Sequence, residues 1–202
     1  MCGIIGTIGN QDVALEIYEG LIALQHRGQD SAGITTYNNK FHLRKSLGLV
    51  RDVFKQEHIE ALKGNMGIGH VRYSTVGGGS YEDAQPFLVN SPYGIAMVYN
   101  GNIYNYWQLR EELFKKDLRF INSNCDLEVI LNVFAHSLSQ FSTTSVNGLS
   151  DDFFERVCQA VSQVFVRAKG AYSVAATVAG KGLVVFRDPH GIRPLVWGRR
   201  QK

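Results

Sequence analysis

A cysteine stands second in the chain, directly before the apolar stretch GIIG. Near neutral pH a thiol is only a few per cent ionised unless a base or a positive charge assists it. If Met1 is removed, as expected before so small a residue, the freed α-amino group is the nearest base by connectivity. Its pKa of roughly 7.7–8.0 suits proton transfer. Cys2 would then carry nucleophile and base together, although a small buried hydrophobe remains the alternative.

Further polar groups follow the ends of predicted strands or stand at the starts of predicted helices. Proteins usually display functional groups at such places. The groups are Arg27 and Gly28 in LQHRGQDSAGI, Arg72, Ser74 and Thr75 in GHVRYSTVGGG, Asn100 and Gly101 in VYNGN, and Asp126 in SNCDLE.

Together these groups suit a small zwitterion. Arg72 offers a fork for an α-carboxylate, and Asp126 can accept hydrogen bonds from an α-ammonium group. The Asn100 amide and the Gly101 N–H can face a developing oxyanion. Each also has an ordinary interpretation: a surface ion pair for Arg72, a helix cap for Asp126, and a plain turn at Asn100 and Gly101. Their coincidence with Cys2 favours chemistry.

The elements that must position these groups follow from hydrophobic periodicity and turn signals. Strands come first, then helices, then strands again, which indicates an α+β fold. Most strands are apolar on both faces, so we expect a four-layer αββα sandwich of two mainly antiparallel sheets between helices. The predicted strands are 2–9, a hairpin over 31–46, 66–75, 93–101, 171–179, 182–188 and 194–198, and the predicted helices are 12–25, 104–116, 125–138 and 151–170.

Composition narrows the class of protein. The 202 residues are 45% hydrophobic and 19% charged, which is ordinary for a globular chain. The net charge of +3 is scattered rather than gathered in a basic stripe, so a nucleic-acid partner is not expected. The three cysteines are far apart, which favours a reducing compartment over disulfides or zinc. The six histidines lack ligand spacing, so no metal is expected. No stretch reads as a membrane span or a signal peptide, and we expect a cytoplasmic protein.

Five ordered blocks carry a resemblance to a known family. Cys2, LQHRGQDSAG, GHVRYSTVG, YNGNIYN and the Asp126 segment resemble the class II glutamine amidotransferases, a branch of the N-terminal-nucleophile hydrolases. Within that class, HRGQDSAG and FRDPHGIRPL are similar to the amidophosphoribosyltransferases. Glucosamine-6-phosphate synthases would instead be expected to have a tryptophan where this chain has Tyr73, and asparagine synthetases to read Arg-Gly-Pro.

The resemblance implies a role for each matching residue. Cys2 would attack the amide of glutamine, and water would hydrolyse the resulting thioester to glutamate. Asn100 and Gly101 would form the oxyanion hole, and Arg72 and Asp126 would bind the backbone groups of glutamine. The remaining binding residues would be Arg27 and Gly28, in a loop that lines the site, and Ser74 and Thr75, at the start of a stretch to Gln85 that resembles the loop closing over glutamine.

The resemblance also implies more chain than is given. Residues 1–202 would form one glutaminase domain, and a C-terminal phosphoribosyltransferase domain would follow, docking near the segment FRDPHGIRP. That second domain would use the ammonia in the first step of de novo purine synthesis. We expect no cofactor in the glutaminase domain, Mg²⁺ only in the second domain, and a homo-oligomer of the full-length protein. A non-catalytic module that binds glutamine is the alternative of a different class.

Overall fold

A computed structural model describes residues 2–73, 80–140 and 153–200. Met1, Ser74 and Thr75 lie outside the described residues. The elements in chain order are β1 (Gly3–Ile8), α1 (Ala14–Ala23), η1 (Gln25–Arg27), β2 (Ser31–Asn38), β3 (Lys40–Leu47), α2 (Val50–Val53), α3 (Gln56–Ala61), β4 (Met66–Arg72), β5 (Phe87–Val89), β6 (Ile95–Ile103), α4 (Tyr106–Lys115), α5 (Asp126–Gln140), α6 (Phe153–Arg167), β7 (Gly170–Val178) and β8 (Gly182–Arg187).

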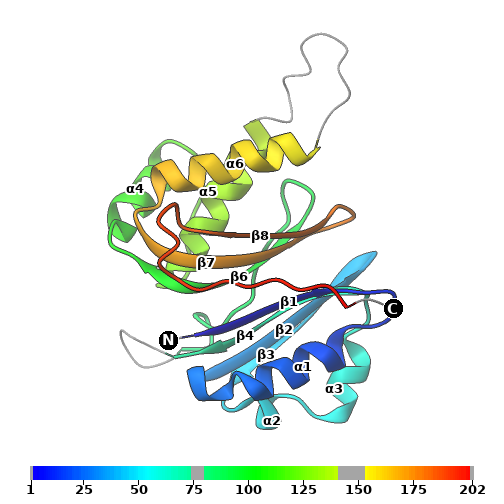
Figure 1. The fold of residues 1–202 in the computed structure, drawn as a ribbon. Helices are drawn as coiled ribbons and strands as arrows, with labels where there is room; N and C mark the ends of the chain where they lie inside the picture. The colour runs from blue at the N-terminus through cyan, green and yellow to red at the C-terminus, as the bar shows by residue number, and fades with distance from the viewer. Residues whose placement is uncertain (1, 74–79, 141–152, 201–202) are drawn as a thin grey trace.

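Two antiparallel sheets of four strands form the centre of the molecule. Their strand orders are β1-β4-β2-β3 and β5-β6-β7-β8. Helices α1, α2 and α3 cover the outer face of the first sheet, and α4, α5 and α6 cover that of the second (Figure 1). The four-layer αββα sandwich expected from the sequence is confirmed.

Three apolar clusters hold the layers together. One joins α4, α5 and α6 to the second sheet, and another joins α1 to the first sheet. The third lies between the two sheets and includes Ile4, Ile68, Ala96, Val98 and Ala175. Side chains alternate along a strand, so these residues identify the face of each strand that looks into the space between the sheets.

The local sequence explains several element boundaries. In α1 the buried residues are Ala14, Ile17 and Leu21, at helical spacing. Asn39 has a φ of 58° at the tip of the β2–β3 hairpin, a conformation that asparagine tolerates better than most residues. Asp12 does not cap α1, since one of its oxygens accepts from the Gly64 N–H at 2.8 Å and the other pairs with Lys63 at 3.2 Å.

The structure corrects three expectations and adds short elements. The strand predicted at 194–198 is absent, and Val196 and Trp197 there are 92% and 86% exposed. Gly170 begins β7 rather than stopping α6, which ends at Arg167. Asn100 and Gly101 lie inside β6 and do not end it. The short elements α2, α3 and β5 were not predicted, because three to six residues carry too little periodicity.

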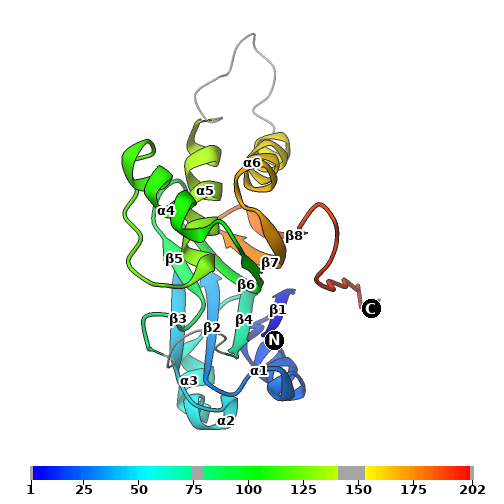
Figure 2. The same ribbon diagram turned by 90° about the vertical axis from the view of Figure 1, so that its left-hand side faces the viewer.

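The segment after β8 runs along the edge of the sandwich beside β8 and β1 (Figure 2). It is held without strand pairing in its described part. The Ser173 hydroxyl on β7 donates to the carbonyls of Arg193 and Pro194, and the Asp188 carboxylate accepts from the N–H groups of His190 and Ile192. Side-chain bonds therefore replace the sheet ladder that the apolar sequence PLVWG suggested.

Candidate active site

Cys2 lies one residue before β1, at the end of the first sheet. Its side chain is half-buried, and its Sγ is 3.9 Å from the carbonyl oxygen of Tyr73. Arg27, from the turn after α1, donates from Nε to the Cys2 carbonyl at 3.0 Å. The turn therefore holds the backbone of the cysteine against the end of β4.

Three of the predicted side chains face the same space. The apolar cluster between the sheets includes Ile4, Ile68 and Val98. Each predicted side chain is an even number of residues from one of these: Cys2 is two from Ile4, Arg72 four from Ile68, and Asn100 two from Val98. By strand alternation their side chains point into that space as well. The start of β1 and the ends of β4 and β6 lie at one end of the sandwich (Figure 1). The fold thus brings these three groups from two sheets to one end of the seam between them.

Arg72 is part of a buried ion pair. Its Nη2 is 3.3 Å from Oδ2 of Asp83, and both side chains are 11% exposed. Its Nη1 is also buried, and the described residues offer it no hydrogen-bond partner. Gly28 is needed beside it, since a Cβ there would stand 2.5 Å from the carbonyl carbon of Arg72. The surface ion pair that was the ordinary alternative for Arg72 is not what the structure contains.

The outer edge of β6 presents the candidate oxyanion donors. Tyr172, opposite Gly101, directs its N–H and C=O to Asp188, so the Gly101 N–H points away from β7. Its neighbours on that edge are occupied: the Tyr99 N–H donates to Gln85 at 2.8 Å and the Ile103 N–H to Asp126 at 2.9 Å. No described acceptor takes the Gly101 N–H, which remains available.

Glycine is required at position 101. A Cβ there would stand 2.4 Å from the carbonyl oxygen of Ala171 on β7. The neighbouring Asn100 is 5% exposed, and its side-chain amide has no acceptor in the described part of the chain. Two adjacent donors, one from backbone and one from a side chain, therefore remain open at this point of β6.

Asp126, the first residue of α5, is directed at β6 and not at its own helix. Its Oδ2 accepts from the Tyr99 hydroxyl and the Ile103 N–H, each at 2.9 Å. Burial raises the pKa of Asp126, and those two hydrogen bonds only partly oppose the shift. The carboxylate is thus placed beside the open N–H of Gly101, where a cation would relieve its desolvation.

The other two cysteines are poor nucleophiles or lie elsewhere. Cys125 is buried, and burial raises the pKa of its thiol to about 12, so it stays protonated. Cys158 is exposed on α6, in the outer helical layer. Cys2 is accordingly the cysteine that shares a site with Arg72 and Asn100.

Comparisons with known proteins identify the family of the chain. The model of a glutamine amidotransferase domain family matches residues 70–202. This chain belongs to that family. The match includes Arg72, Asn100, Gly101 and Asp126.

The curated relatives indicate the branch of the amidotransferase family. The amidophosphoribosyltransferase of Pseudomonas aeruginosa is 51% identical over 201 residues, which are 99% of this chain and 39% of that protein. The one from Escherichia coli strain K12 is 50% identical over 202 residues, with the same coverage. The chain thus spans about two fifths of the length of these relatives, and the similarity to amidophosphoribosyltransferases predicted from HRGQDSAG and FRDPHGIRPL is confirmed.

Solved structures agree with the sequence relatives. The glutamine phosphoribosylpyrophosphate amidotransferase from B. subtilis, complexed with ADP and GMP, has a TM-score of 0.75 and 29% identity, covering 96% of this chain and 38% of that one. A second structure, described as the allosteric regulatory enzyme of purine biosynthesis, has a TM-score of 0.77 at 30% identity and the same coverage.

Sequence reasoning missed two residues of this amidotransferase site. Asp83 pairs with Arg72, and Gln85 joins the Tyr99 N–H to the Cys125 sulfur. Both lie in EDAQPF, after the glycine-rich stretch, and an acidic residue there was the available signal. Ser74 and Thr75, predicted to bind substrate, lie outside the described residues.

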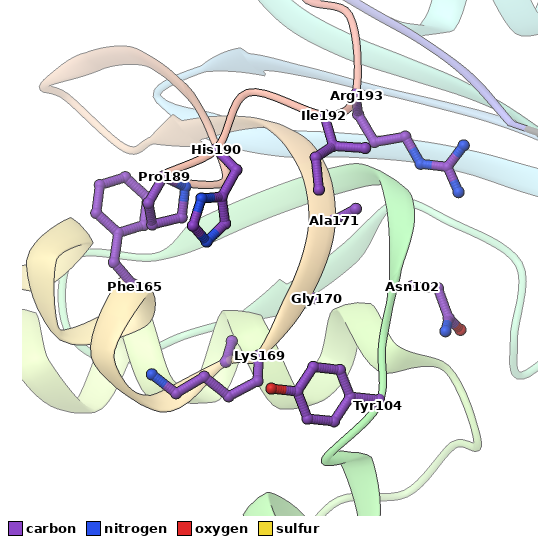
Figure 3. A pocket seen from close by; sticks show the side chains of 11 residues that line it. Asn102, Tyr104, Phe165, Lys169, Gly170, Ala171, Pro189, His190, Ile192 and Arg193 are labelled. Atoms are coloured by element: carbon purple, nitrogen blue, oxygen red, sulfur yellow. The ribbon is translucent and has the colours of Figure 1, made fainter.

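A pocket of about 630 Å³ lies next to the site but is not lined by its residues. It lies between the end of β6, the start of β7, the end of α6 and the C-terminal segment (Figure 3). Asn102, which directly follows Gly101, is its nearest link in sequence to the predicted site. The lining is Asn102, Tyr104, Phe165, Ala168, Lys169, Gly170, Ala171, Pro189, His190, Ile192 and Arg193.

The described residues lack both a metal-binding cluster and a membrane-spanning helix. They contain no cluster of three or more His, Cys, Asp or Glu side chains placed to hold a metal ion. Among the helices in those ranges, none has both the length and the apolar character needed to cross a bilayer.

Proposed function

We propose that this chain is a glutaminase domain that hydrolyses glutamine to glutamate and ammonia through a thioester on Cys2. The observation that carries the proposal is the convergence of Cys2, Arg72 and Asn100 on one end of the seam between the sheets. The open N–H of Gly101 and the carboxylate of Asp126 adjoin that end.

The chemistry requires two steps at one sulfur. The Cys2 thiolate adds to the amide carbon of glutamine, and the Asn100 amide and the Gly101 N–H donate to the resulting oxyanion. The C–N bond then breaks, and the nitrogen leaves as ammonia with a proton from the amino group of Cys2, freed once Met1 is removed. Water adds to the thioester, which releases glutamate and returns the thiol.

Recognition of glutamine rests on two opposite charges. The open Nη1 of Arg72 suits the α-carboxylate, in a charge-assisted hydrogen bond. The carboxylate of Asp126 suits the α-ammonium group. Arg27 acts indirectly, because its hydrogen bond to the Cys2 carbonyl holds the nucleophile in place.

The names of the relatives extend the proposal to a larger protein. In a longer chain, a phosphoribosyltransferase domain with Mg²⁺ would use the ammonia to convert phosphoribosyl pyrophosphate into phosphoribosylamine, the first step of purine synthesis. Such a protein would be cytoplasmic and homo-oligomeric. The exposed Val196 and Trp197 support docking of that second domain on the segment after β8.

The test is a glutaminase assay on the 202-residue chain. Glutamate and ammonia should form in equal amounts, and Cys2→Ala should abolish both. Cys158→Ala, which removes an exposed thiol on α6, should leave the rate unchanged. A folded chain that binds glutamine without hydrolysing it would instead be the non-catalytic binding module.

A further inference from the structure

Asp83 joins the two halves of the site through its carboxylate. One oxygen, Oδ2, is 3.3 Å from Nη2 of Arg72 at the end of β4. The other, Oδ1, accepts from the N–H of Asn124 at 3.2 Å, in the turn just before α5. Asp83 is 8% exposed, so both contacts are made with little water present.

Each of the two segments that Asp83 joins carries a charged residue that binds glutamine in the proposed function. Arg72 is itself one of these residues, and Asp126 is the second residue after Asn124. The turn before α5 has other local supports: the Glu128 carboxylate accepts from the N–H groups of Asn122 and Ser123. Among the described residues, Asp83 alone is hydrogen-bonded both to this turn and to the Arg72 side chain.

Arg72 has one Nη group without a hydrogen-bond partner among the described residues. A guanidinium is planar and presents its two Nη groups as a rigid fork. Asp83 occupies Nη2, while Nη1 is buried without a partner in the described part of the chain. The contact with Asp83 restrains the orientation of the fork, and the other Nη group is left without a carboxylate partner.

We propose that Asp83 is a positioning residue that orients Arg72 toward the α-carboxylate of glutamine, with the turn before α5 as its second anchor. The inference rests on the proposed function for the identity of the ligand. It assigns to Asp83 the preference for an amide that carries an α-carboxylate. Asp83 acts through Arg72 and does not touch the reacting atoms.

The test measures glutamine binding by calorimetry in the Cys2→Ala chain, in which no turnover occurs. Asp83→Asn should weaken glutamine binding by about tenfold or more, the scale of one charge-assisted hydrogen bond. In an Arg72→Met background the same change should alter affinity by less than about twofold, because the residue through which Asp83 acts is gone. Binding of 4-aminobutanamide, which lacks the α-carboxylate, should also change by less than about twofold.

Asp12 supplies a matched control at the opposite end of β4. It too places one carboxylate oxygen on a cation, Lys63, and the other on a backbone N–H, that of Gly64. Asp12→Asn should therefore leave glutamine affinity unchanged. Circular dichroism on each variant establishes that it is folded, and the analogue measurement needs no change at Arg72.

The outcomes separate this inference from the proposed function. Equal losses with Asp83→Asn in both Arg72 backgrounds, equal losses for glutamine and 4-aminobutanamide, or no loss at all would overturn the positioning role. Absence of glutamine binding in the parent chain would overturn it as well. Binding with the expected pattern but no hydrolysis by wild type would leave the inference standing and refute the glutaminase proposal.

Discussion

Single residues of this site combine burial with charge. Asp126 has a raised pKa because burial disfavours its ionised form, yet the ionised form is the one that pairs with an ammonium group. Arg72 is buried as well, with one Nη group paired and the other open. Arg72 and Asp126 are thus two buried charged groups without a full set of partners. A zwitterionic ligand would supply the missing opposite charge to each.

Asp126→Asn tests this at the residue scale. The asparagine oxygen can still accept from Ile103, but it cannot pair with an α-ammonium group, so the KM for glutamine should rise about tenfold or more.

In the native state Asp126 holds its proton to a higher pH than in the unfolded chain. Wild type therefore loses stability as pH rises from about 3.8 through the raised pKa, and the variant lacks this loss.

Urea unfolding of both proteins at several pH values between about 3.5 and 7 measures this difference. The stability of the Asp126→Asn variant relative to wild type should increase with pH across that window. A relative stability that falls with pH would mean that the carboxylate is stabilised, rather than strained, in the native protein.

At the scale of elements, the turn after α1 and the end of β4 touch backbone to backbone, with no side chain between them at Gly28. Gly28 follows η1 and lies against the carbonyl group of Arg72, at the end of β4. The Asp30 N–H donates to the Arg72 carbonyl at 3.0 Å, two residues farther along. The turn that carries Arg27 is therefore fixed against the strand that carries Arg72.

Gly28→Ala should separate these two elements. Its Cβ would meet backbone atoms at 2.5–2.8 Å, which flexible side chains cannot relieve. We expect a loss of about 1–3 kcal/mol in unfolding free energy and a large loss of glutaminase activity. Gly9→Ala is the control, because its Cβ would have only an ordinary contact at 3.5 Å. Similar stabilities for the two variants would contradict the packing argument.

Long elements were predictable because their periodicity was strong. The helix of 12–25 and the strand of 93–101 correspond to α1 and β6. The segment 194–198 was mispredicted because apolar residues suggested a strand, whereas side-chain bonds from Ser173 hold the chain just before it. Asp83 was missed for a related reason: its importance arises from two partners, 11 and 41 residues away in sequence.

On the scale of the whole molecule, the site lies where the seam between two sheets opens. Each sheet contributes one wall, so neither half of the chain forms the site alone. His70, between Ile68 and Arg72 in the alternation of β4, closes the seam behind the site. It is fully buried, and its two ring nitrogens make no well-formed hydrogen bond to the described residues, although the backbone of Tyr99 lies close enough to interact with the ring.

The burial of His70 predicts acid sensitivity of the whole fold. Burial and the nearby charge of Arg72 lower the pKa of His70 to about 3, and the backbone of Tyr99 opposes this shift only in part. In the unfolded chain His70 takes up a proton near pH 6.5, whereas in the native state it stays neutral until about pH 3. The free energy of unfolding therefore falls as pH drops from about 6.5 toward 3. His70→Leu should reduce that slope by up to about 1.4 kcal/mol per pH unit in denaturant titrations. An unchanged slope would show that His70 becomes protonated in the native state.

The central claim is that Cys2 is the nucleophile of a glutamine site, and covalent labelling tests it most directly. A glutamine analogue with a diazoketone in place of the amide alkylates the attacking thiol with loss of nitrogen gas. Peptide mass analysis should find one adduct, on Cys2, and excess glutamine should prevent it. A folded chain that is labelled on Cys125 or Cys158, or on no cysteine, would contradict the account.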